Sequence, residues 1–397
     1  MQFGAGKREW KQVNMPDLSD GKAGAPKISA PVSLQLMLAD ATRQLNVCNS
    51  CRYCEGLCAV YPAIERRTLF ELADLSQLGN LCHDCRACFD SCMYTAPHEF
   101  DINMPKLFAE IRLFDYQRFV WPYKPLKIFS GRLGIASAAA ISALIVFIFA
   151  IVNVGFGGLI TRNSGPQSPY ILIPADQLDV LLLIPAIFTT VVLLLAGRKY
   201  WKEVGGAPTG LSTRVILTSI WYAITFRYMD GAGANCNYPD DEVPSPSRRR
   251  FHFLVSYGFG LCIVSTTAAA FLQHVQGIEP PYAWISVPVI SGVLGGIGLI
   301  IGCWGLVKLK LHNSEVTSIA KMNIKDYGFL FALEFLALSG MATLLTRETL
   351  VFGLVFLIHL STIILAFALA AYSKFVHFIF RFLSILRDNF ERAEQLQ

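Results

Sequence analysis

The sequence predicts an all-α protein in which a helical, cysteine-rich soluble domain precedes a six-span transmembrane helix bundle. Three observations favour this fold class. The 397 residues are 53% hydrophobic with a mean hydropathy of +0.45, which is too apolar for a soluble globular protein. Eight cysteines fall in two short runs near the N-terminus. The stretch between these runs has helical leucine spacing and no alternating strand pattern.

The domain boundaries follow the change in composition along the chain. We expect a Gly/Pro/Lys-rich lead without a signal peptide at 1–35, a soluble domain at 36–120 and a membrane domain at 121–390. The last boundary, near Trp121, is rich in proline and aromatic residues, which suits a membrane interface. Within the soluble domain, leucines recur at helical spacing, namely Leu69, Leu72, Leu75 and Leu78.

Six stretches are apolar and long enough to cross about 30 Å of hydrocarbon. They lie near residues 129–154, 178–197, 252–274, 284–306, 327–346 and 350–373. Lysine and arginine gather in alternate segments, including the loop 198–251, so the positive-inside rule predicts that both termini and the cysteine runs are cytoplasmic. We therefore expect a multi-pass protein of the bacterial inner membrane. The net charge of +5 is explained by this topology and does not indicate a nucleic-acid partner.

One further apolar stretch, 209–228, carries Arg214 and Arg227. A seventh span at this position would break the alternation of charged loops. We therefore expect a helix that lies on the inner membrane surface or packs under the bundle.

The two cysteine runs share one spacing, C-x2-C-x2-C-x3-C, from Cys48 to Cys58 and from Cys82 to Cys92. In this pattern three thiolates of one run hold a [4Fe–4S] cluster, and the fourth cysteine ligates the cluster of the other run. The predicted ligand sets are Cys48, Cys51, Cys54 and Cys92 for one cluster, and Cys82, Cys85, Cys88 and Cys58 for the other. Structural zinc leaves no role for eight ligands in this spacing, and a reducing cytoplasm disfavours disulfides.

Four histidines lie in or at the ends of two predicted spans. His252 and His274 are 22 residues apart, and His359 and His377 are 18 apart, so each pair shares one helix face. Because the two spans run antiparallel, His252 should meet His377 near the cytoplasm, and His274 should meet His359 further out. Two such pairs predict one or two bis-histidine b-type haems. The alternative is that the histidines are polar groups satisfied between helices.

Five more residues are candidates for a quinone or proton site. Arg248, Arg249, Arg250 and Lys374 border the inner histidine pair, and Glu334 is a carboxylate within a span. An ionisable residue in hydrocarbon is a functional candidate because it is costly to bury. For Glu334 the alternatives are a structural hydrogen bond and a hydrogen bond to a haem-ligating histidine.

In combination these motifs resemble the tricarballylate/citrate-utilisation protein B family over about residues 40–390. The resemblance rests on the double cysteine run and on three segments: Arg249-Arg250-Phe251-His252, the glycine-rich loop 231–239 with Cys236, and Lys374-Phe375-Val376-His377. The same unit is similar to the C-terminal half of the flavoprotein fusion CobZ. The end of the last span is similar to the haem-binding end of nitrate reductase gamma-type subunits. The family commonly has a second histidine where this chain has Phe253.

The resemblance implies an electron-transfer subunit of an oxidoreductase complex. Such a protein re-oxidises the flavin of a cytoplasmic FAD-dependent dehydrogenase, which acts on a small carboxylic acid, and reduces membrane quinone. The residues agree, since the chain shows no phosphate loop or dinucleotide fingerprint of its own. One alternative is the cytochrome arm of a disulfide-reductase-like complex. Another is a non-catalytic redox sensor, although the tail after Arg381 is short for an output domain. Homo-oligomer formation is compatible with each of these functions.

Overall fold

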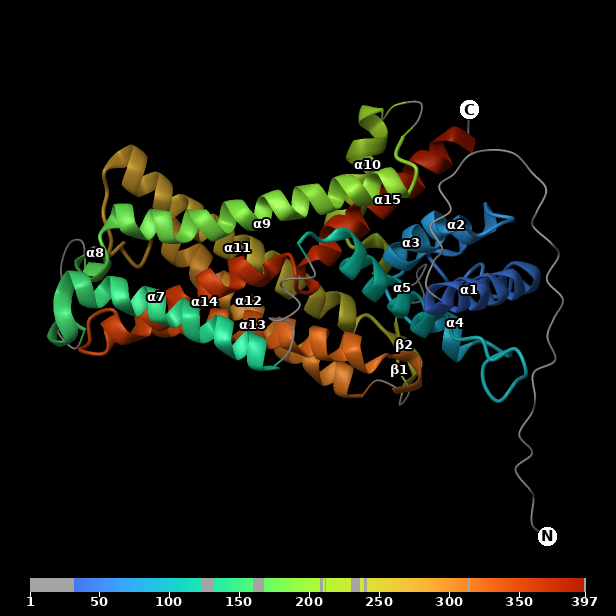
Figure 1. Ribbon diagram of the computed structural model, residues 1–397, viewed down its shortest axis with the longest axis horizontal. Coiled ribbons are helices and arrows are strands. Elements are labelled where there is room, and N and C mark those ends of the chain that lie inside the picture. Colours follow the sequence, from blue (N-terminus) through green and yellow to red (C-terminus); the bar gives the residue numbers. More distant parts are fainter. Residues whose placement is uncertain are drawn as a thin grey trace, which may run out of the picture.

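The computed structural model describes residues 32–122, 132–159, 168–207, 210, 212–229, 236–238, 241–312 and 315–395. The protein is elongated and almost entirely helical, with the cysteine domain at one end and a helix bundle at the other (Figure 1). We call the end of the bundle next to the cysteine domain the head end, and the opposite end the far end. The predicted lead up to residue 31 and the glycines of the loop at 231–235 lie outside the described residues.

Helices build the cysteine domain, and no strand occurs among its described residues. A helix is present between the cysteine runs, but it begins at Leu72, so Leu69 of the predicted leucine spacing lies outside it and is exposed. The helix begins with a capping box, in which Glu71 and Asp74 each bond the other's backbone. It buries Leu75, Leu78 and Leu81 completely, which anchors both runs to one core. The helices of the domain are α1 (Val32–Cys51), α2 (Tyr61–Glu65), α3 (Leu72–Leu81), α4 (Ala87–Asp90) and α5 (Met104–Phe119).

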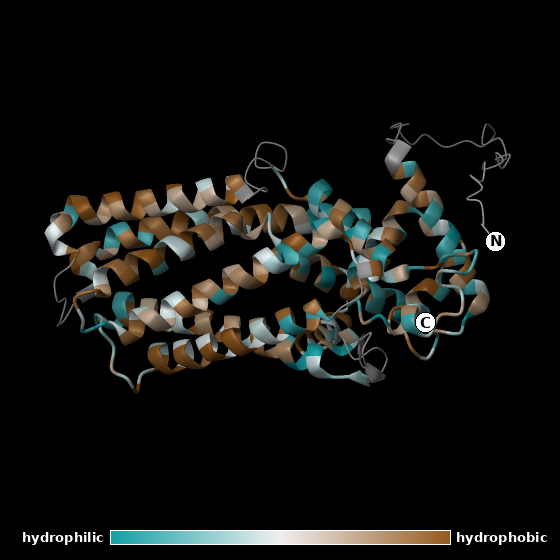
Figure 2. Cartoon of the chain, turned by 90° about the horizontal axis from the view of Figure 1, so that it is seen from below, coloured by the Kyte–Doolittle hydropathy of each residue, from teal (hydrophilic) through white to brown (hydrophobic). Residues whose placement is uncertain are grey.

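Among the described residues, six helices are long and apolar enough to cross a membrane, as the sequence predicts. Their hydrophobic residues extend along the bundle and give way to hydrophilic residues toward the cysteine domain (Figure 2). Large apolar side chains remain exposed on their outer faces, as expected for contact with lipid. The spans are α7 (Arg132–Gly158), α9 (Ala175–Glu203), α11 (Ser247–Gln276), α12 (Val287–Leu311), α13 (Ala320–Leu345) and α14 (Phe352–Ala370), and the short α8 (Ser168–Leu172) precedes α9.

The small residues of α12 allow its backbone to approach α11 closely. A Cβ atom on Gly258 would lie 2.8 Å from the Gly295 carbonyl oxygen, and one on Gly295 would lie 2.7 Å from the Gly258 carbonyl oxygen. Neither position accepts a larger side chain without separating the helices. The glycines of this span therefore serve packing and fix where α11 places its histidines.

At the head end, α15 (His377–Gln395) leaves the bundle and packs against α3, α9 and α10 (Thr213–Ile224). The apolar segment 209–228 thus contains the 12-residue α10, which is too short to span a membrane. A small antiparallel hairpin of β1 (Cys236–Tyr238) and β2 (Asp241–Ser245) precedes α11. The single turns η3 (Glu315–Thr317) and η4 (Lys374–Val376) complete this end.

Tyr200 of α9 links the bundle, α15 and the cysteine domain. Its ring stacks on Phe380 with centroids 4.6 Å apart. Its hydroxyl lies 2.6 Å from the Ser384 hydroxyl and donates to the Ser76 carbonyl oxygen at 3.0 Å. All four residues are fully buried. The two domains therefore share a packed core, which holds the cysteine runs in a defined position relative to the spans.

Candidate metal centres

All eight cysteines of the two runs line one chamber in the cysteine domain. Their electrostatic neighbours divide them into two groups. The pKa of the Cys48 thiol is raised to about 12 by burial and then by nearby thiols, those of Cys54, Cys92 and Cys51. The pKa of the Cys58 thiol is raised above its usual range by burial and then by the thiols of Cys82 and Cys85. The pKa of the Cys88 thiol is raised by burial, then by the thiols of Cys58, Cys85 and Cys82, and last by Cys54 of the other group.

These two groups have the composition of the two predicted ligand sets. In each group three cysteines come from one run and the fourth comes from the other run. Among the described residues, no three cysteine, histidine or carboxylate side chains are arranged to hold a single metal ion.

Left-handed backbone turns occur in both runs, and amide groups in and after the second run donate to cysteine sulfurs. Arg52, Asp84 and Arg86 have φ angles of 57°, 57° and 67°, which non-glycine residues rarely adopt. The Asp84 amide donates to the Cys82 sulfur at 3.4 Å, and the Tyr94 amide donates to the Cys92 sulfur at 3.4 Å. Amide donors to sulfur are one of the ways in which proteins tune an iron–sulfur cluster. The chamber therefore fits clusters in chemistry as well as in ligand number.

At the head end the structure places the rings of His252 and His377 beside each other. Their centroids lie 6.4 Å apart and their planes differ by 84°. Metal–imidazole bonds of about 2 Å place the ring centres of a bis-histidine haem roughly 6 Å apart. The separation in this structure therefore fits a haem iron between the two rings.

The Nδ1 atom of each of these two histidines lies within hydrogen-bond distance of a protein oxygen. His377 Nδ1 lies 2.6 Å from the Lys374 carbonyl oxygen, which can only accept, so Nδ1 carries the proton and Nε2 is free to bind a metal. His252 Nδ1 lies 3.2 Å from the Ser256 hydroxyl. Burial, with Arg381 and Lys374 nearby, lowers the pKa of His377 to about 3 and keeps its ring neutral. A neutral, oriented imidazole is the form that ligates metals.

Both rings line a cavity of about 740 Å³ that extends from the second cysteine run into the bundle. This volume lies within the range of ligand and cofactor sites. The deep end is apolar and is lined by Val255, Phe259, Ile263, Leu330 and Leu333. Six cations and two carboxylates line the cavity, namely Arg86, Arg112, Arg248, Lys310, Lys374 and Arg381 with Asp84 and Asp326. An amphipathic occupant with acidic groups, such as a haem with its propionates, suits this distribution of charge.

The structure separates the predicted arginines. Arg248 lines the cavity, whereas Arg249 donates to the Thr225 carbonyl oxygen at 2.8 Å and Arg250 is exposed. Lys374 also lines the cavity and pairs with Asp326 at 2.6 Å; Lys310 pairs with the same carboxylate at 2.7 Å.

The other two histidines have separate partners toward the far end. His274 Nε2 lies 3.3 Å from a carboxylate oxygen of Asp179 on α9, and its side chain is 50% exposed. His359 lies against α13, with Nδ1 2.9 Å from the Ser339 hydroxyl. Their contacts among the described residues lead to different helices, α9 for His274 and α13 for His359. The continuous helix that the sequence predicts between His359 and His377 is interrupted, since α14 ends at Ala370 and α15 begins at His377.

Glu334 is buried on α13 beside Trp304 and Cys303. Among the described residues neither of its carboxylate oxygens has a hydrogen bond of good geometry. It does not line the large cavity. Glu334 is therefore a separate ionisable group within the bundle.

Arg381 is the most informative residue that the sequence did not single out as a ligand neighbour. It lies one helical turn after His377 and reaches back to the second cysteine run. Its guanidinium donates to the Cys82 carbonyl oxygen at 2.8 Å, to the Asn80 carbonyl oxygen at 3.2 Å and to His83 Nδ1 at 3.0 Å. The only sequence signal for it is its i+4 spacing from His377.

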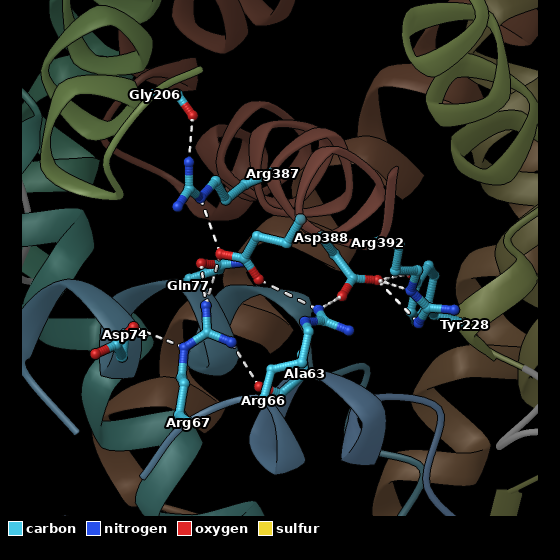
Figure 3. Close-up of polar contacts among 11 residues, drawn as sticks. Ala63, Arg66, Arg67, Asp74, Gln77, Gly206, Tyr228, Arg387, Asp388 and Arg392 are labelled. Atoms are coloured by element: carbon cyan, nitrogen blue, oxygen red, sulfur yellow. Dashed lines mark hydrogen bonds and ion pairs between the residues drawn. The ribbon is translucent and has the colours of Figure 1, made fainter. Parts of the chain in front are cut away.

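Ion pairs along the rest of α15 extend this link to the first cysteine run. Asp388 is fully buried and accepts hydrogen bonds from Arg66 and Tyr228, and Glu391 pairs with Arg66 at 3.2 Å and with Arg67 at 2.8 Å (Figure 3). Arg66 and Arg67 directly follow α2 of the cysteine domain. Helix α15 therefore holds the cysteine domain to the bundle along most of its length.

Comparisons with known proteins agree with this two-part organisation. Residues 131–397 match the model of the citrate utilization protein B family, and residues 41–118 match that of the citrate utilization protein B Fer4-like domain. The chain is 37% identical over 362 residues to the citrate utilization protein B of Escherichia coli, which covers 90% of this chain and 94% of that protein. No solved structure matches the chain.

Proposed function

Because the chain belongs to the citrate utilization protein B family, we propose that it conducts electrons from a reduced flavoprotein to membrane quinone. The donor would be a cytoplasmic FAD-dependent dehydrogenase that acts on a tricarballylate-type carboxylic acid. Two [4Fe–4S] clusters in the cysteine domain and b-type haem in the bundle would carry the electrons. The distribution of lysine and arginine supports a position of the cysteine domain in the cytoplasm, on the side of the donor.

The side chains divide the work of holding these groups. The two sets of four thiols would bind the clusters as thiolates, and their burial would keep water away from them. His252 and His377 would bind the haem iron through Nε2, since their Nδ1 atoms already have partners. When bound, the clusters and the haem each carry one electron, which divides a two-electron flavin oxidation into single steps.

The single observation that carries the proposal is the position of Arg381. His377 and Arg381 are one turn apart on α15, and the Arg381 guanidinium bonds the Cys82 carbonyl oxygen at 2.8 Å. The second cysteine run and the histidine pair are thus joined by one helix turn and one hydrogen bond. Such a short, buried connection suits electron transfer between the two sites, and the same contacts hold the cysteine domain against the bundle.

The acceptor end of the proposal rests on ionisable groups near the histidines. Arg248 and Lys374 line the cavity and would hold the polar head of a quinone or a haem propionate. A quinone takes up a proton with each electron, and Glu334 is a buried carboxylate that would supply one within the bundle. A second haem would require His274 Nε2 to leave Asp179, whereas the Ser339 contact of His359 uses Nδ1 and leaves Nε2 available.

The test is cofactor content followed by electron delivery, with the whole protein purified anaerobically. We expect about eight non-haem iron atoms and about eight sulfide ions per chain, together with a b-type pyridine haemochrome spectrum. Adding the partner dehydrogenase and its acid should then reduce the haem rapidly. Cys85→Ser should stop this reduction, whereas Cys303→Ser, a buried cysteine of α12, should not. A colourless, iron-free preparation, or a haem that dithionite reduces and the dehydrogenase does not, would overturn the proposal.

A further inference from the structure

The two cysteine runs have the same spacing but place their intervening side chains in different surroundings. Arg52 and Arg86 each follow the second cysteine of their run, and both have left-handed backbones. The Arg52 side chain is 54% exposed and pairs with Glu65 at 3.2 Å. The Arg86 side chain is 5% exposed, and its Nη1 has no hydrogen-bond partner among the described residues. The equivalent cations thus face solvent in one run and the interior in the other.

Asn49 and His83, which follow the first cysteine of each run, also differ in whether their donor groups have a partner within the protein. The Asn49 amide donates to the Arg67 carbonyl oxygen at 2.9 Å, so this donor is used within the protein. His83 is 5% exposed and its Nδ1 lies 3.0 Å from Arg381 Nη1. Since a guanidinium cannot accept a hydrogen bond, Nδ1 is the acceptor and the ring proton lies on Nε2. That buried N–H group has no partner among the described residues.

Two unpartnered donors buried in one loop are costly unless a bound group accepts from them. His83 and Arg86 line the cysteine chamber and also border the large cavity next to it. We propose that His83 Nε2 and Arg86 Nη1 donate to the sulfur atoms of the cluster held by Cys82, Cys85, Cys88 and Cys58, and that they make it the cluster of higher reduction potential. This inference rests on the proposed function, because it requires both clusters to be present.

The physical reason is the charge of the reduced cluster. Reduction adds one negative charge, and hydrogen-bond donors and nearby cations stabilise that charge, which raises the potential. Around the second run, Arg112 and Arg381 donate to the Cys82 carbonyl oxygen at 3.3 and 2.8 Å. Asp84 offsets part of this positive charge and lies 3.6 Å from Arg86. The low dielectric of the interior strengthens each of these interactions relative to the half-exposed Arg52.

A higher potential at the second cluster would direct electrons from the first cluster to the second. The first run borders solvent through Tyr53, which is 57% exposed, whereas the second run borders the histidine pair through Arg381. An electron that arrives at the first cluster would pass to the second, which is reduced as the first is oxidised. A higher potential at the second cluster makes this step favourable and keeps the electron on the side of the bundle.

Potentiometric titration of the whole protein, followed by the EPR signals of the reduced clusters, tests this inference. The wild type should show two one-electron steps at different potentials. Arg86→Gln should lower the upper step so that the equilibrium ratio of reduced to oxidised second cluster falls about tenfold, a shift of about 59 mV. Arg52→Gln is the matched control and should leave the upper step in place. Arg86→Lys retains the charge and should restore most of the wild-type potential.

His83→Phe provides a second measurement if Arg86→Gln loses its cluster. It removes the Nε2 donor while keeping a ring of similar shape against Tyr228, and the upper step should again fall. Two clusters that are present but whose upper step moves in neither variant, or moves equally in Arg52→Gln, would overturn the inference and leave the proposed function intact. A wild-type protein without iron and sulfide would overturn both.

Discussion

The two ends of the bundle contain the same histidine chemistry and are built differently. At the head end His252 and His377 lie with ring centroids 6.4 Å apart beside a cavity of about 740 Å³. Toward the far end His274 is half exposed beside Asp179, and His359 is buried against Ser339. The predicted common helix face holds for His252 and His274, which are both on α11, whereas the helix is interrupted between His359 on α14 and His377 at the start of α15. The difference teaches that helical periodicity only selects the face of a helix on which a histidine lies. A pair of ligands also requires another element that places a second histidine against that face. At the head end, η4 and the start of α15 do this by placing His377 beside His252.

The largest expected effect separates these two pairs. We predict that His377→Ala binds at least tenfold less of the proposed b-type haem, because it removes one of the two side chains that would hold the iron. His274→Ala, the matched far-end variant, should retain the haem. The measurement is haem per chain by pyridine haemochrome, with iron content as a check that the cysteine domain is intact. Equal losses in the two variants would remove the distinction between the ends.

The parts of this architecture that could be predicted depend on one-dimensional patterns. Hydropathy located the six spans, and leucine spacing located α3, because each signal is local to its element. The common end of His252 and His377 followed from the antiparallel order of the spans, whereas the turns counted from His359 to His377 cross the break between α14 and α15. The grouping of thiols in the chamber has the composition that run spacing alone suggests.

What the sequence could not provide are contacts between elements that are distant in the chain. Arg381 bonds residues about 300 positions away, and its role depends on how α15 docks against α3. Nothing in the sequence distinguishes the three arginines at 248–250 from one another. Only Arg248 of the three lines the cavity, because successive residues of a helix point in different directions. No local pattern distinguishes His274 from His252, since the partner of each is set by a neighbouring helix.

The second effect concerns how firmly each end is held. We predict that Asp388→Ala destabilises the cysteine domain by about 3 kcal/mol, because it leaves the buried Arg66 with one acid fewer. Asp179→Ala breaks the half-exposed contact to His274 at the far end and should cost less than about 1 kcal/mol. Thermal loss of the cluster absorbance reports the first change, and helical circular dichroism reports both. If the two variants lost similar amounts of stability, the buried ion-pair network of α15 would contribute no more to the free energy of unfolding than a surface ion pair does.

The third effect is a pH dependence at the head end. Asp115 is fully buried under donors from Ser76 and Asn80, and burial raises its pKa to about 7. An unfolded aspartate has a pKa of about 3.9, so the native state binds the extra proton between these values. The stabilisation by this protonated group is complete below about pH 4 and is lost as the pH rises through about 7.

Asp115→Asn carries no titratable proton and tests this dependence. Relative to wild type, we predict that the variant gains about 1–2 kcal/mol in stability between pH 5 and pH 7.5. The comparison is made by denaturant unfolding of the cysteine domain at both pH values. Asp179→Asn, which replaces a half-exposed far-end carboxylate, should show no comparable gain. If the difference in stability between wild type and Asp115→Asn were the same at both pH values, Asp115 would not be the group that binds the extra proton in the native state.

The smallest effect examines the far end most directly. The ring of His359 lies against Gly340, where an added Cβ would be 3.0 Å from Cε1 and 3.4 Å from Nε2. Gly340→Ala should therefore shift the ring by a few tenths of an ångström and cost about 1 kcal/mol relative to Gly328→Ala, a position on the same helix with open space around it. Because His359 belongs to the pair that has separate partners, the haem spectrum should stay unchanged in both variants. A haem spectrum altered by Gly340→Ala alone would mean that His359 touches a haem, and the far end would then be a second cofactor site like the first.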